Sequence, residues 1–246
     1  MTRVVIAGAT GRVGQAMMSG LAQQPDIEVV GGFGSRSASE LPNLLAQADV
    51  LVDFTTAAAA PDILLSAAAQ GVRPVSGTTG LPPDALDRLD AELTRHGLGG
   101  AWAPNFAVGA ALMMHFARIA ARFMDAAEVI EMHHDRKVDA PSGTAVSTAR
   151  MIRAAHGQDL PDPPVERWAL EGSRGAVDGG VRVHSVRLPG LVAHQEVLFG
   201  AAGQVLTIRH DATGRDTYVP GVVLAIKAVQ QHVGLLRGLD TLMGLS

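Results

Sequence analysis

Residues 131–145 carry side chains whose types and spacing could perform acid–base chemistry on a small anion. His133 and His134 end a segment with the pattern of a strand, and Lys137 follows three residues later. Histidine exchanges a proton near neutral pH, and lysine is a compact cation with transferable protons. A turn of Ser142, Gly143 and Thr144 then opens a helical pattern, where backbone amides attract negative charge. This stretch therefore predicts an anion site with its own proton donors.

Simpler interpretations of these residue types stand beside that prediction. Lys137 could be a solvated charge, although it is one of only two lysines in the chain, with Lys227. Asp139 could orient Lys137 or cap the turn before Pro141. Adjacent histidines can bind a metal, but no third ligand stands at a suitable spacing, so no metal is expected. Five other histidines are expected to be packing or surface residues: His96, His115, His156, His184 and His232.

A glycine-rich turn near the N-terminus predicts a dinucleotide site. A short run rich in β-branched residues, 3–7, precedes this turn, and a helical stretch follows it. In such a strand–turn–helix unit, glycines let the backbone approach a pyrophosphate at the helix start. The spacing is G-x-x-G-x-x-G rather than the common G-x-G-x-x-G, and glycines can serve a turn alone. The turn consists of Gly8, Ala9, Thr10, Gly11, Arg12, Val13 and Gly14.

The end of the next predicted strand, 27–32, bears on the choice of cofactor. A carboxylate there usually holds the ribose 2′-hydroxyl of NADH, whereas a basic residue suits the 2′-phosphate of NADPH. No carboxylate stands at this place; Ser35 and Arg36 do, and Arg12 could assist. The sequence therefore favours NADPH, with NADH as the alternative. The simpler interpretation of Arg36 is a solvated loop charge.

Alternating strands and helices in the first hundred residues predict a Rossmann-like, doubly wound parallel sheet. Further strands are expected over 48–54, 72–76 and 99–103, with helices over 57–70 and 82–96. Ligands of such sheets bind beyond the carboxyl ends of the strands, where small polar loops stand here. Each loop alone could be generic. Together they contribute Phe54, Thr55, Gly77, Thr78, Thr79, Ala103, Pro104, Asn105 and Phe106.

The pattern changes after Asn105 and predicts a second, α+β domain with a mixed sheet. The predicted division is a dinucleotide-binding domain of residues 1–106 and 213–246, and a substrate-binding and oligomerisation domain of residues 107–212. A helical pattern over 217–232 returns to the first domain. In the second domain we expect helices over 108–123 and 142–155, a long loop over 156–180, and strands over 127–134, 181–188, 191–199 and 204–210, the last three joined as hairpins.

The predicted four-stranded sheet of the second domain has helices on one side only. Its other face needs a cover, so we expect a homo-oligomer built sheet against sheet. The apolar residues of these strands are Val181, Val183, Val186, Leu191, Val197, Leu198, Val205, Leu206 and Ile208.

Composition narrows the compartment and the partners. The chain has no cysteine, which excludes disulfides and thiolate chemistry and fits a cytoplasmic location. A formal net charge of −4 argues against a broad nucleic-acid surface. The most apolar long run, 107–123, contains His115, Arg118 and Arg122, so it predicts a buried helix and no membrane span. The first residues are too short an apolar run for a signal peptide.

Residues 131–145 resemble the signature of the dihydrodipicolinate (4-hydroxy-tetrahydrodipicolinate) reductase family of lysine and diaminopimelate biosynthesis. That signature reads roughly Glu-x-His-His-x-x-Lys-x-Asp-Ala-Pro-Ser-Gly-Thr-Ala, and the segment agrees at every fixed place. The resemblance covers nearly the whole chain, including the glycine turn, the cofactor loops and a late motif of Arg187, Gly190 and His194. The chain departs from many members at Gly34 and Ser35, where an acidic residue is common; this supports NADPH.

The resemblance implies a role for each residue of the signature. His133 is implied as the acid/base residue and Lys137 as the proton donor, while His134, Gly143 and Thr144 hold a carboxylate of a cyclic dicarboxylate imine. Hydride comes from the nicotinamide, and the assembly is a homotetramer with a shared barrel of strands. The residues alone leave two rival functions open: a different NADP-dependent reductase of two-domain shape, and a dinucleotide-binding regulator without catalysis.

Overall fold

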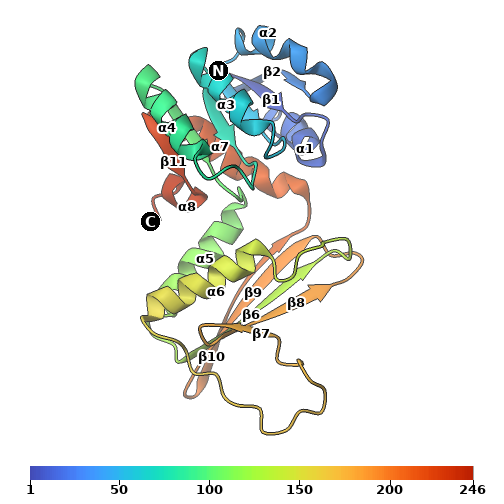
Figure 1. Ribbon diagram of the computed structural model, residues 1–246, viewed down its shortest axis with the longest axis vertical. Helices are drawn as coiled ribbons and strands as arrows, with labels where there is room; N and C mark the ends of the chain where they lie inside the picture. Colours follow the sequence, from blue (N-terminus) through green and yellow to red (C-terminus); the bar gives the residue numbers. More distant parts are fainter. Residues whose placement is uncertain (246) are drawn as a thin grey trace. The chain divides into compact units, whose positions relative to one another are not determined.

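The computed structural model describes residues 1–245 and consists of two compact units (Figure 1). Unit 1 comprises Met1–Val108 together with the chain from Arg215 onward, and unit 2 comprises Gly109–Gly214. No helix among the described residues is long and apolar enough to cross a membrane.

Unit 1 is built on a six-stranded sheet in the order β11-β5-β4-β3-β1-β2, and every pairing in it is parallel. The central strand β3 is buried at every residue because helices cover both faces of the sheet. The predicted Rossmann-like sheet is confirmed, with one additional strand. The strands are β1 (Thr2–Ala7), β2 (Ile27–Phe33), β3 (Val50–Asp53), β4 (Arg73–Ser76), β5 (Gly99–Trp102) and β11 (Gly234–Arg237).

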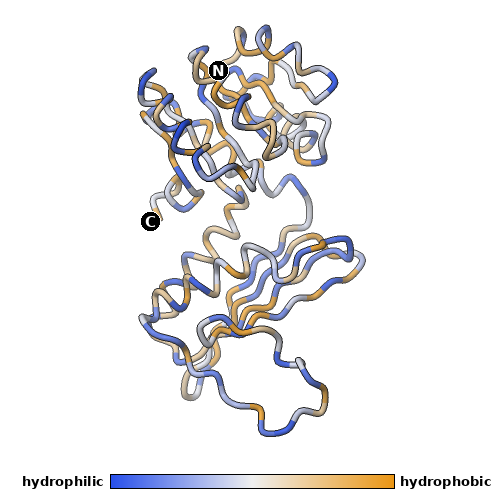
Figure 2. The backbone as a smooth tube through the Cα atoms, in the orientation of Figure 1, coloured by the Kyte–Doolittle hydropathy of each residue, from blue (hydrophilic) through white to orange (hydrophobic). Residues whose placement is uncertain are grey.

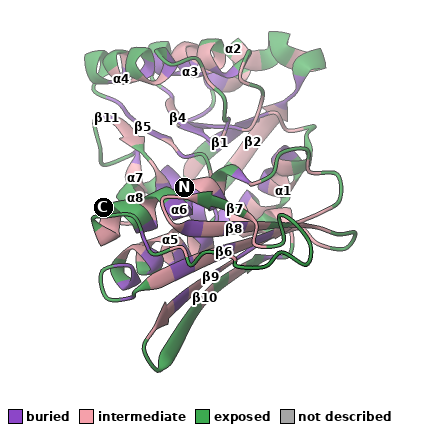
Figure 3. Ribbon diagram, turned by 60° about the horizontal axis from the view of Figure 1, so that its bottom comes forward, coloured by how far each residue is buried: buried purple, intermediate pink, exposed green. Residues whose placement is uncertain are grey.

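Helices lie on both sides of this sheet. Figure 3 shows it between α3 (Ala60–Ala69) and α4 (Ala85–His96) on one side and α1 (Arg12–Leu21) and α7 (Val219–Ala228) on the other. Strand β11 was not predicted, because four residues carry too little periodicity. Nor were the short helices between β2 and β3. The short elements are η1 (Ser35–Glu40), α2 (Leu41–Leu45), η2 (Arg215–Tyr218) and α8 (Leu239–Leu242).

Unit 2 has a mixed sheet in the order β10-β9-β6-β8-β7, which confirms the predicted second sheet. It has five strands instead of four, because β7 lies in the predicted long loop and pairs with β8. The hairpin between β9 and β10 is as predicted. The predicted hairpin of β8 and β9 is wrong, because β6 lies between these strands and runs parallel to β8. The strands are β6 (Ala126–His133), β7 (Ala176–Asp178), β8 (Val181–Arg187), β9 (Ala193–Ala201) and β10 (Gln204–Ala212).

Helices α5 (Val108–Ala120) and α6 (Gly143–His156) cover one face of the second sheet. The strands alternate in hydropathy along their length (Figure 2), as a sheet with one covered face requires. This alternation corrects the predicted partner surface: Val181, Val183 and Val197 are buried against the helices. The register also puts Leu206 opposite Phe199, on the helix side, and leaves Val205 outward and 73% exposed.

Candidate active site

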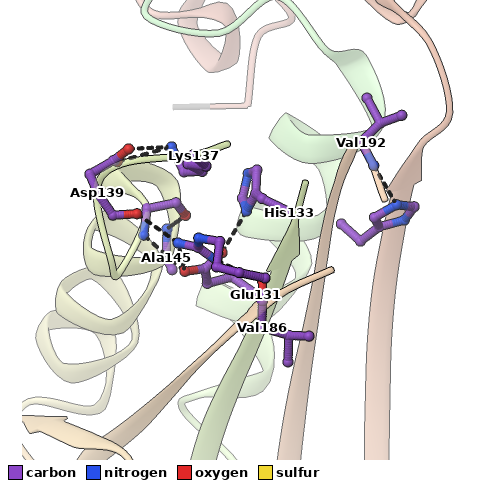
Figure 4. Close-up of polar contacts among 10 residues, drawn as sticks. Glu131, His133, Lys137, Asp139, Ala145, Val186 and Val192 are labelled. Carbon is purple, nitrogen blue, oxygen red and sulfur yellow. Dashed lines mark hydrogen bonds and ion pairs between the residues drawn. The ribbon is translucent and has the colours of Figure 1, made fainter. Parts of the chain in front are cut away.

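A buried carboxylate, Glu131, organises a polar cluster at the end of β6 (Figure 4). Arg187 Nη1 donates to its Oε2 at 2.9 Å, and Arg187 Nη2 donates to its Oε1 at 2.8 Å. His133 Nδ1 lies 2.5 Å from Oε2, and the backbone N–H of Ser142 donates to Oε1 at 3.2 Å. The parallel register sets Arg187 opposite His133, so the order of the strands brings the guanidinium to the carboxylate. Two strands and the start of α6 therefore meet at one side chain.

Glu131 is fully buried, and its surroundings favour the charged form. Burial raises the pKa of Glu131. Hydrogen bonds from Arg187, Ser185 and His133 outweigh burial and hold the pKa below its ordinary value of 4.5. Glu131 is therefore a fixed negative charge at neutral pH.

His133 is neutral at the same pH. Burial lowers the pKa of His133 below 6.5; Glu131 opposes this shift, while the positive charges of Lys137 and Arg187 add to it. An ionised carboxylate can only accept hydrogen bonds, so Nδ1 carries the ring proton and donates it to Glu131. Nε2 then keeps a free lone pair. His133 rests as a base, not as an acid.

The two lowered pKa values predict that stability falls as the solution is acidified. Between the lowered pKa and the ordinary one, the unfolded chain binds more protons than the folded chain, so stability rises with pH. The unfolding free energy is expected to decline as pH drops below 6.5 for His133 and further below 4.5 for Glu131. Burial also lowers the pKa of His210, which acts in the same direction.

Denaturant unfolding at a series of pH values measures this decline. His133→Gln is the control variant, because it removes one titrating group and should flatten the curve near pH 6.5. A wild-type curve that stays level from neutral pH to about pH 5 contradicts the expectation.

Lys137 lies in the loop after β6 and pairs with Asp139. Its Nζ donates to both carboxylate oxygens, at 2.8 and 2.9 Å. This contact with Lys137 holds the pKa of Asp139 below its ordinary value. The two hydrogen bonds fit the sequence interpretation in which Asp139 orients the lysine. The Asp139 side chain is 54% exposed, and such a pair is weak enough for a bound anion to compete for the ammonium.

The start of α6 leaves two backbone donors open. Ser142 Oγ accepts from Ala145 N at 3.2 Å, and the Ser142 N–H is already bonded to Glu131. No acceptor within residues 1–245 takes the N–H of Gly143 or Thr144, as expected for a first helical turn. A Cβ at Gly143 would meet nothing within 4 Å. Gly143 and Thr144 can therefore donate to an anion, while Ser142 offers only its hydroxyl proton.

His134 is a further predicted site residue of unit 2, and Arg187 and His194 of the same unit belong to the late motif. Nδ1 of His134 is buried and has no hydrogen-bond partner in the described part of the chain. Arg187 contacts Glu131, whereas His194 bonds through Nδ1 with Asp211 of β10 at 2.6 Å and stands opposite Met132 in the strand register. Sequence reasoning grouped His133, Lys137 and the turn in one candidate segment but gave no role to Glu131, whose burial is a tertiary property.

A hollow of about 340 Å³ in unit 1 lies at the carboxyl ends of β1, β3 and β4. It brings together eight residues predicted to bind the cofactor: Gly11, Arg12, Val13, Phe54, Thr55, Gly77, Thr78 and Thr79. Thr56, Ala57 and Arg215 also line it. Other predicted cofactor residues do not line it: Gly8, Ala9, Thr10, Gly14, Ser35, Arg36, Ala103, Pro104, Asn105 and Phe106.

Two glycines of the turn beside this hollow stand where a side chain would not fit. Gly8 has φ +81°, and a Cβ there would lie 2.4 Å from the Phe54 carbonyl oxygen. A Cβ on Gly14 would lie 2.0 Å from the Gly8 carbonyl oxygen. Gly8 and Gly14 shape the turn but do not line the hollow. Because they have no side chains, the backbone amides of the turn can approach a pyrophosphate.

Buried Asp53 holds the two neighbouring loops together. It accepts from Thr55 Oγ1 at 2.5 Å, from Ser76 Oγ at 2.7 Å and from Thr78 Oγ1 at 2.8 Å. The hydroxyl-bearing loops after β3 and β4 are thus joined at one carboxylate at the edge of the hollow. The Asp53 carboxylate itself is fully buried and serves the loops.

Three arginines near the glycine turn fit an anionic ligand. No carboxylate of residues 1–245 pairs with Arg12, Arg36 or Arg215. Arg36 belongs to η1, directly after Gly34, whose Cβ would lie 2.5 Å from Thr10 Oγ1, so its segment adjoins the turn. Arg215 was not predicted as a site residue, because no local motif marks it. The only signal for it was that the chain returns to unit 1 at this residue.

Two family models match the chain, one over each half. They are "Dihydrodipicolinate reductase, N-terminus", over residues 2–106, and "Dihydrodipicolinate reductase, C-terminus", over residues 109–243. The chain belongs to the dihydrodipicolinate reductase family. The resemblance of residues 131–145 to this family is thereby confirmed.

Relatives named 4-hydroxy-tetrahydrodipicolinate reductase support this assignment over the full length. The protein of Moorella thermoacetica is 47% identical across 98% of this chain and 97% of its own length. That of Cutibacterium acnes is 46% identical across 100% of both. The dipicolinate-bound dihydrodipicolinate reductase of Paenisporosarcina sp. TG-14 matches with a TM-score of 0.88 and 37% identity, covering 98% of each chain.

Membership in the family makes this chain an oxidoreductase that uses NAD(P)H and acts on a small molecule. No group of three or more His, Asp or Glu residues that could hold a metal ion occurs within residues 1–245.

Proposed function

We propose that this chain reduces 4-hydroxy-tetrahydrodipicolinate to tetrahydrodipicolinate in lysine and diaminopimelate biosynthesis, with NADPH as preferred cofactor. The observation that carries the proposal is the Glu131 cluster, in which a neutral His133 and the ammonium of Lys137 lie beside an open helix start. We place the reaction in the cytoplasm, because a chain without cysteine fits a reducing compartment.

The cofactor supplies hydride from C4 of the nicotinamide when it is bound. In unit 1 the glycine turn and the loops after β3 and β4, which line the hollow, would hold it together with the loop after β5. Arg12, Arg36 and Arg215 would neutralise its phosphates. The residues proposed to bind or shape this site are Gly8, Ala9, Thr10, Gly11, Arg12, Val13, Gly14, Ser35, Arg36, Phe54, Thr55, Gly77, Thr78, Thr79, Ala103, Pro104, Asn105 and Phe106, to which we add Arg215.

The substrate is held by one carboxylate and receives a proton from Lys137. The open N–H groups of Gly143 and Thr144, the Ser142 hydroxyl and His134 bind that carboxylate. After the substrate hydroxyl has left as water with a proton taken from solvent, the carbon conjugated with the imine would receive hydride from the bound cofactor. Negative charge then develops toward the ring nitrogen, and Lys137 Nζ donates the proton that balances it. His133, neutral before the reaction, offers the Nε2 lone pair as an acceptor; it could take up a proton from solvent there and pass that proton to the lysine after Lys137 has given up its own.

One assay separates this proposal from its rivals. Loss of NADPH absorbance is followed with the condensation product of pyruvate and aspartate semialdehyde. Turnover on this product supports the proposal. Turnover only on other imines favours a different reductase, and cofactor binding without turnover on any imine favours a regulator.

Arg36 is expected to set the preference for NADPH. Arg36→Ala removes a cation beside the proposed 2′-phosphate position and should lower the ratio of kcat/KM for NADPH to that for NADH by about 10–100-fold, since a charge-assisted hydrogen bond contributes about 1.5–3 kcal/mol. The NADH value should not change. Arg88→Ala is the matched control, because Arg88 is an exposed arginine of α4 paired with Asp84. A wild-type enzyme that uses NADH more efficiently than NADPH contradicts the assignment.

The chain is further proposed to form a homotetramer through unit 2. On the open face of its sheet, Val205 shares an outward side with Leu198. On the helix side, an apolar hollow of about 390 Å³ lies between α5 and β10. It is lined by Phe116, Ile119, Ala120, Leu206 and Ile208. Exposed apolar surface of this kind marks an interface. Sedimentation as a monomer at micromolar concentration would refute the tetramer.

A further inference from the structure

A buried glutamine on β9 is not among the residues that take part in the proposed mechanism. Gln195 is 5% exposed and lies directly opposite Glu131 in the antiparallel register of β6 and β9. Its Nε2 donates to Thr148 Oγ1 at 2.8 Å, and Thr148 Oγ1 donates to the Thr144 carbonyl oxygen at 2.8 Å. Thr148 is fully buried. A chain of two hydrogen bonds therefore runs from the sheet to the first turn of α6.

The proton count determines the direction of this chain. Thr148 has one hydroxyl proton, which it gives to the Thr144 carbonyl, so it must accept from the amide group of Gln195. The amide oxygen, Oε1, is consequently left buried, with no partner in the described chain. Such an orphan acceptor destabilises a fold, and a leucine of similar size would avoid it. Stability alone does not account for an amide at this place.

The hydrogen bonds of the first turn show what the amide holds. The peptide group between Thr144 and Ala145 is fixed at both ends: its carbonyl accepts from Thr148, and its N–H donates to Ser142 Oγ. The preceding Ser142 N–H is held by Glu131. The donors left over are the N–H groups of Gly143 and Thr144, which lie between these anchored peptides.

We propose that Gln195, acting through Thr148, is a positioning residue that holds the Gly143 and Thr144 N–H groups in the orientation that binds the substrate carboxylate. Glu131 and Gln195, at one register position of neighbouring strands, thus anchor opposite sides of the same turn. The inference rests on the proposed function of that turn. Small errors in the direction of such donors weaken binding strongly, so the support behind them matters.

The test compares Gln195→Leu and Thr148→Val with Gln230→Leu. Gln230 makes similar contacts in unit 1, where its Nε2 donates to the Ile226 carbonyl at 2.9 Å and to Thr2 Oγ1 at 3.2 Å. Calorimetric titration with dipicolinate, used as a stable dicarboxylate, measures anion binding. Steady-state kinetics give KM and kcat, fluorescence gives the Kd for NADPH, and thermal melting gives Tm.

For Gln195→Leu and Thr148→Val we expect the dipicolinate Kd and the substrate KM to rise by about tenfold, the loss typical of one misaligned hydrogen bond. The kcat should change less than KM, and the NADPH Kd should stay at its wild-type value. Tm should not fall in Gln195→Leu, which removes the orphan acceptor, and should fall modestly in Thr148→Val, which leaves Gln195 Nε2 without its acceptor. The double variant should be no worse than either single one, because both residues belong to one chain of contacts. Thr148→Ser, which retains the hydroxyl, should restore binding. Gln230→Leu should leave the dipicolinate Kd unchanged.

Two results would overturn the inference. One is wild-type dipicolinate binding in both variants. The other is a parallel loss of Tm, NADPH affinity and kcat, which indicates a merely structural role. A wild-type chain that neither binds dipicolinate nor turns over the substrate overturns the proposed function, and this inference with it. That outcome is distinguishable because it does not depend on any variant.

Discussion

Replacement of Lys137 by alanine is expected to lower kcat by roughly 10²–10³-fold, since a positioned proton donor contributes about 10²–10⁴ to the rate. His133 cannot take its place, because the pKa of His133 lies below its ordinary value and the ring is neutral at pH 7. Binding of NADPH should be unchanged, because the cofactor residues belong to unit 1. Steady-state kinetics and fluorescence titration measure the two quantities.

Lys137→Arg separates proton donation from charge. Arginine keeps the positive charge and can pair with Asp139, but it does not give up its proton at neutral pH. The expected result is a KM close to wild type with a kcat as low as that of the alanine variant. Lys227→Ala is the control, because Lys227 is the other lysine and only approaches Asp26, at 3.5 Å on the surface. A Lys137→Arg enzyme with wild-type kcat would show that Lys137 acts as a charge alone.

Glu131→Gln is expected to reduce both stability and activity. The variant loses the buried charge that holds Arg187 and His133, and breaking a buried ion pair by removing one partner costs about 3–5 kcal/mol. The His133 ring loses the acceptor that fixes its tautomer, so kcat should fall by roughly 10²-fold as well. Denaturant unfolding and steady-state kinetics give the two values.

Glu92→Gln is the matched control for this effect. Glu92 also contacts one arginine and one histidine, Arg95 and His96, but on the surface of α4, where such pairs contribute about 0–1 kcal/mol. A second comparison is Glu131→Met combined with Arg187→Met. Removing both partners should recover much of the stability and none of the activity. An active Glu131→Gln enzyme would contradict the role given to this carboxylate.

Much of the chain's organisation was predictable from local pattern. Helices and strands such as α6 and β6 were expected within a few residues of their observed ends, because their apolar spacing and turn residues are local properties. The pairing of β8 was predicted wrongly, because a short Pro-Gly connection resembles a hairpin turn, and nothing local reveals that β6 lies between β8 and β9.

The candidate site divides in the same way. His133, Lys137 and Gly143 stand within eleven residues of one another, so their proximity followed from the chain itself. Arg215, from near the other end of the sequence, lines the unit 1 hollow, and Gln195 of β9 contacts Thr148 of α6. Contacts of that kind depend on which strands are neighbours, and no spacing rule contains them.

The sequence by itself determined the chemistry: a signature of histidines, a lysine and an amide-bearing turn, together with a glycine turn for a dinucleotide. These are short-range features, in which residue type and spacing suffice. Only the tertiary structure decided how that chemistry is tuned. Glu131 becomes a buried anion because β8 brings Arg187 beside it, and the same burial keeps His133 neutral and leaves the proton to Lys137. Burial and long-range pairing set pKa values, and both arise only when distant segments pack together.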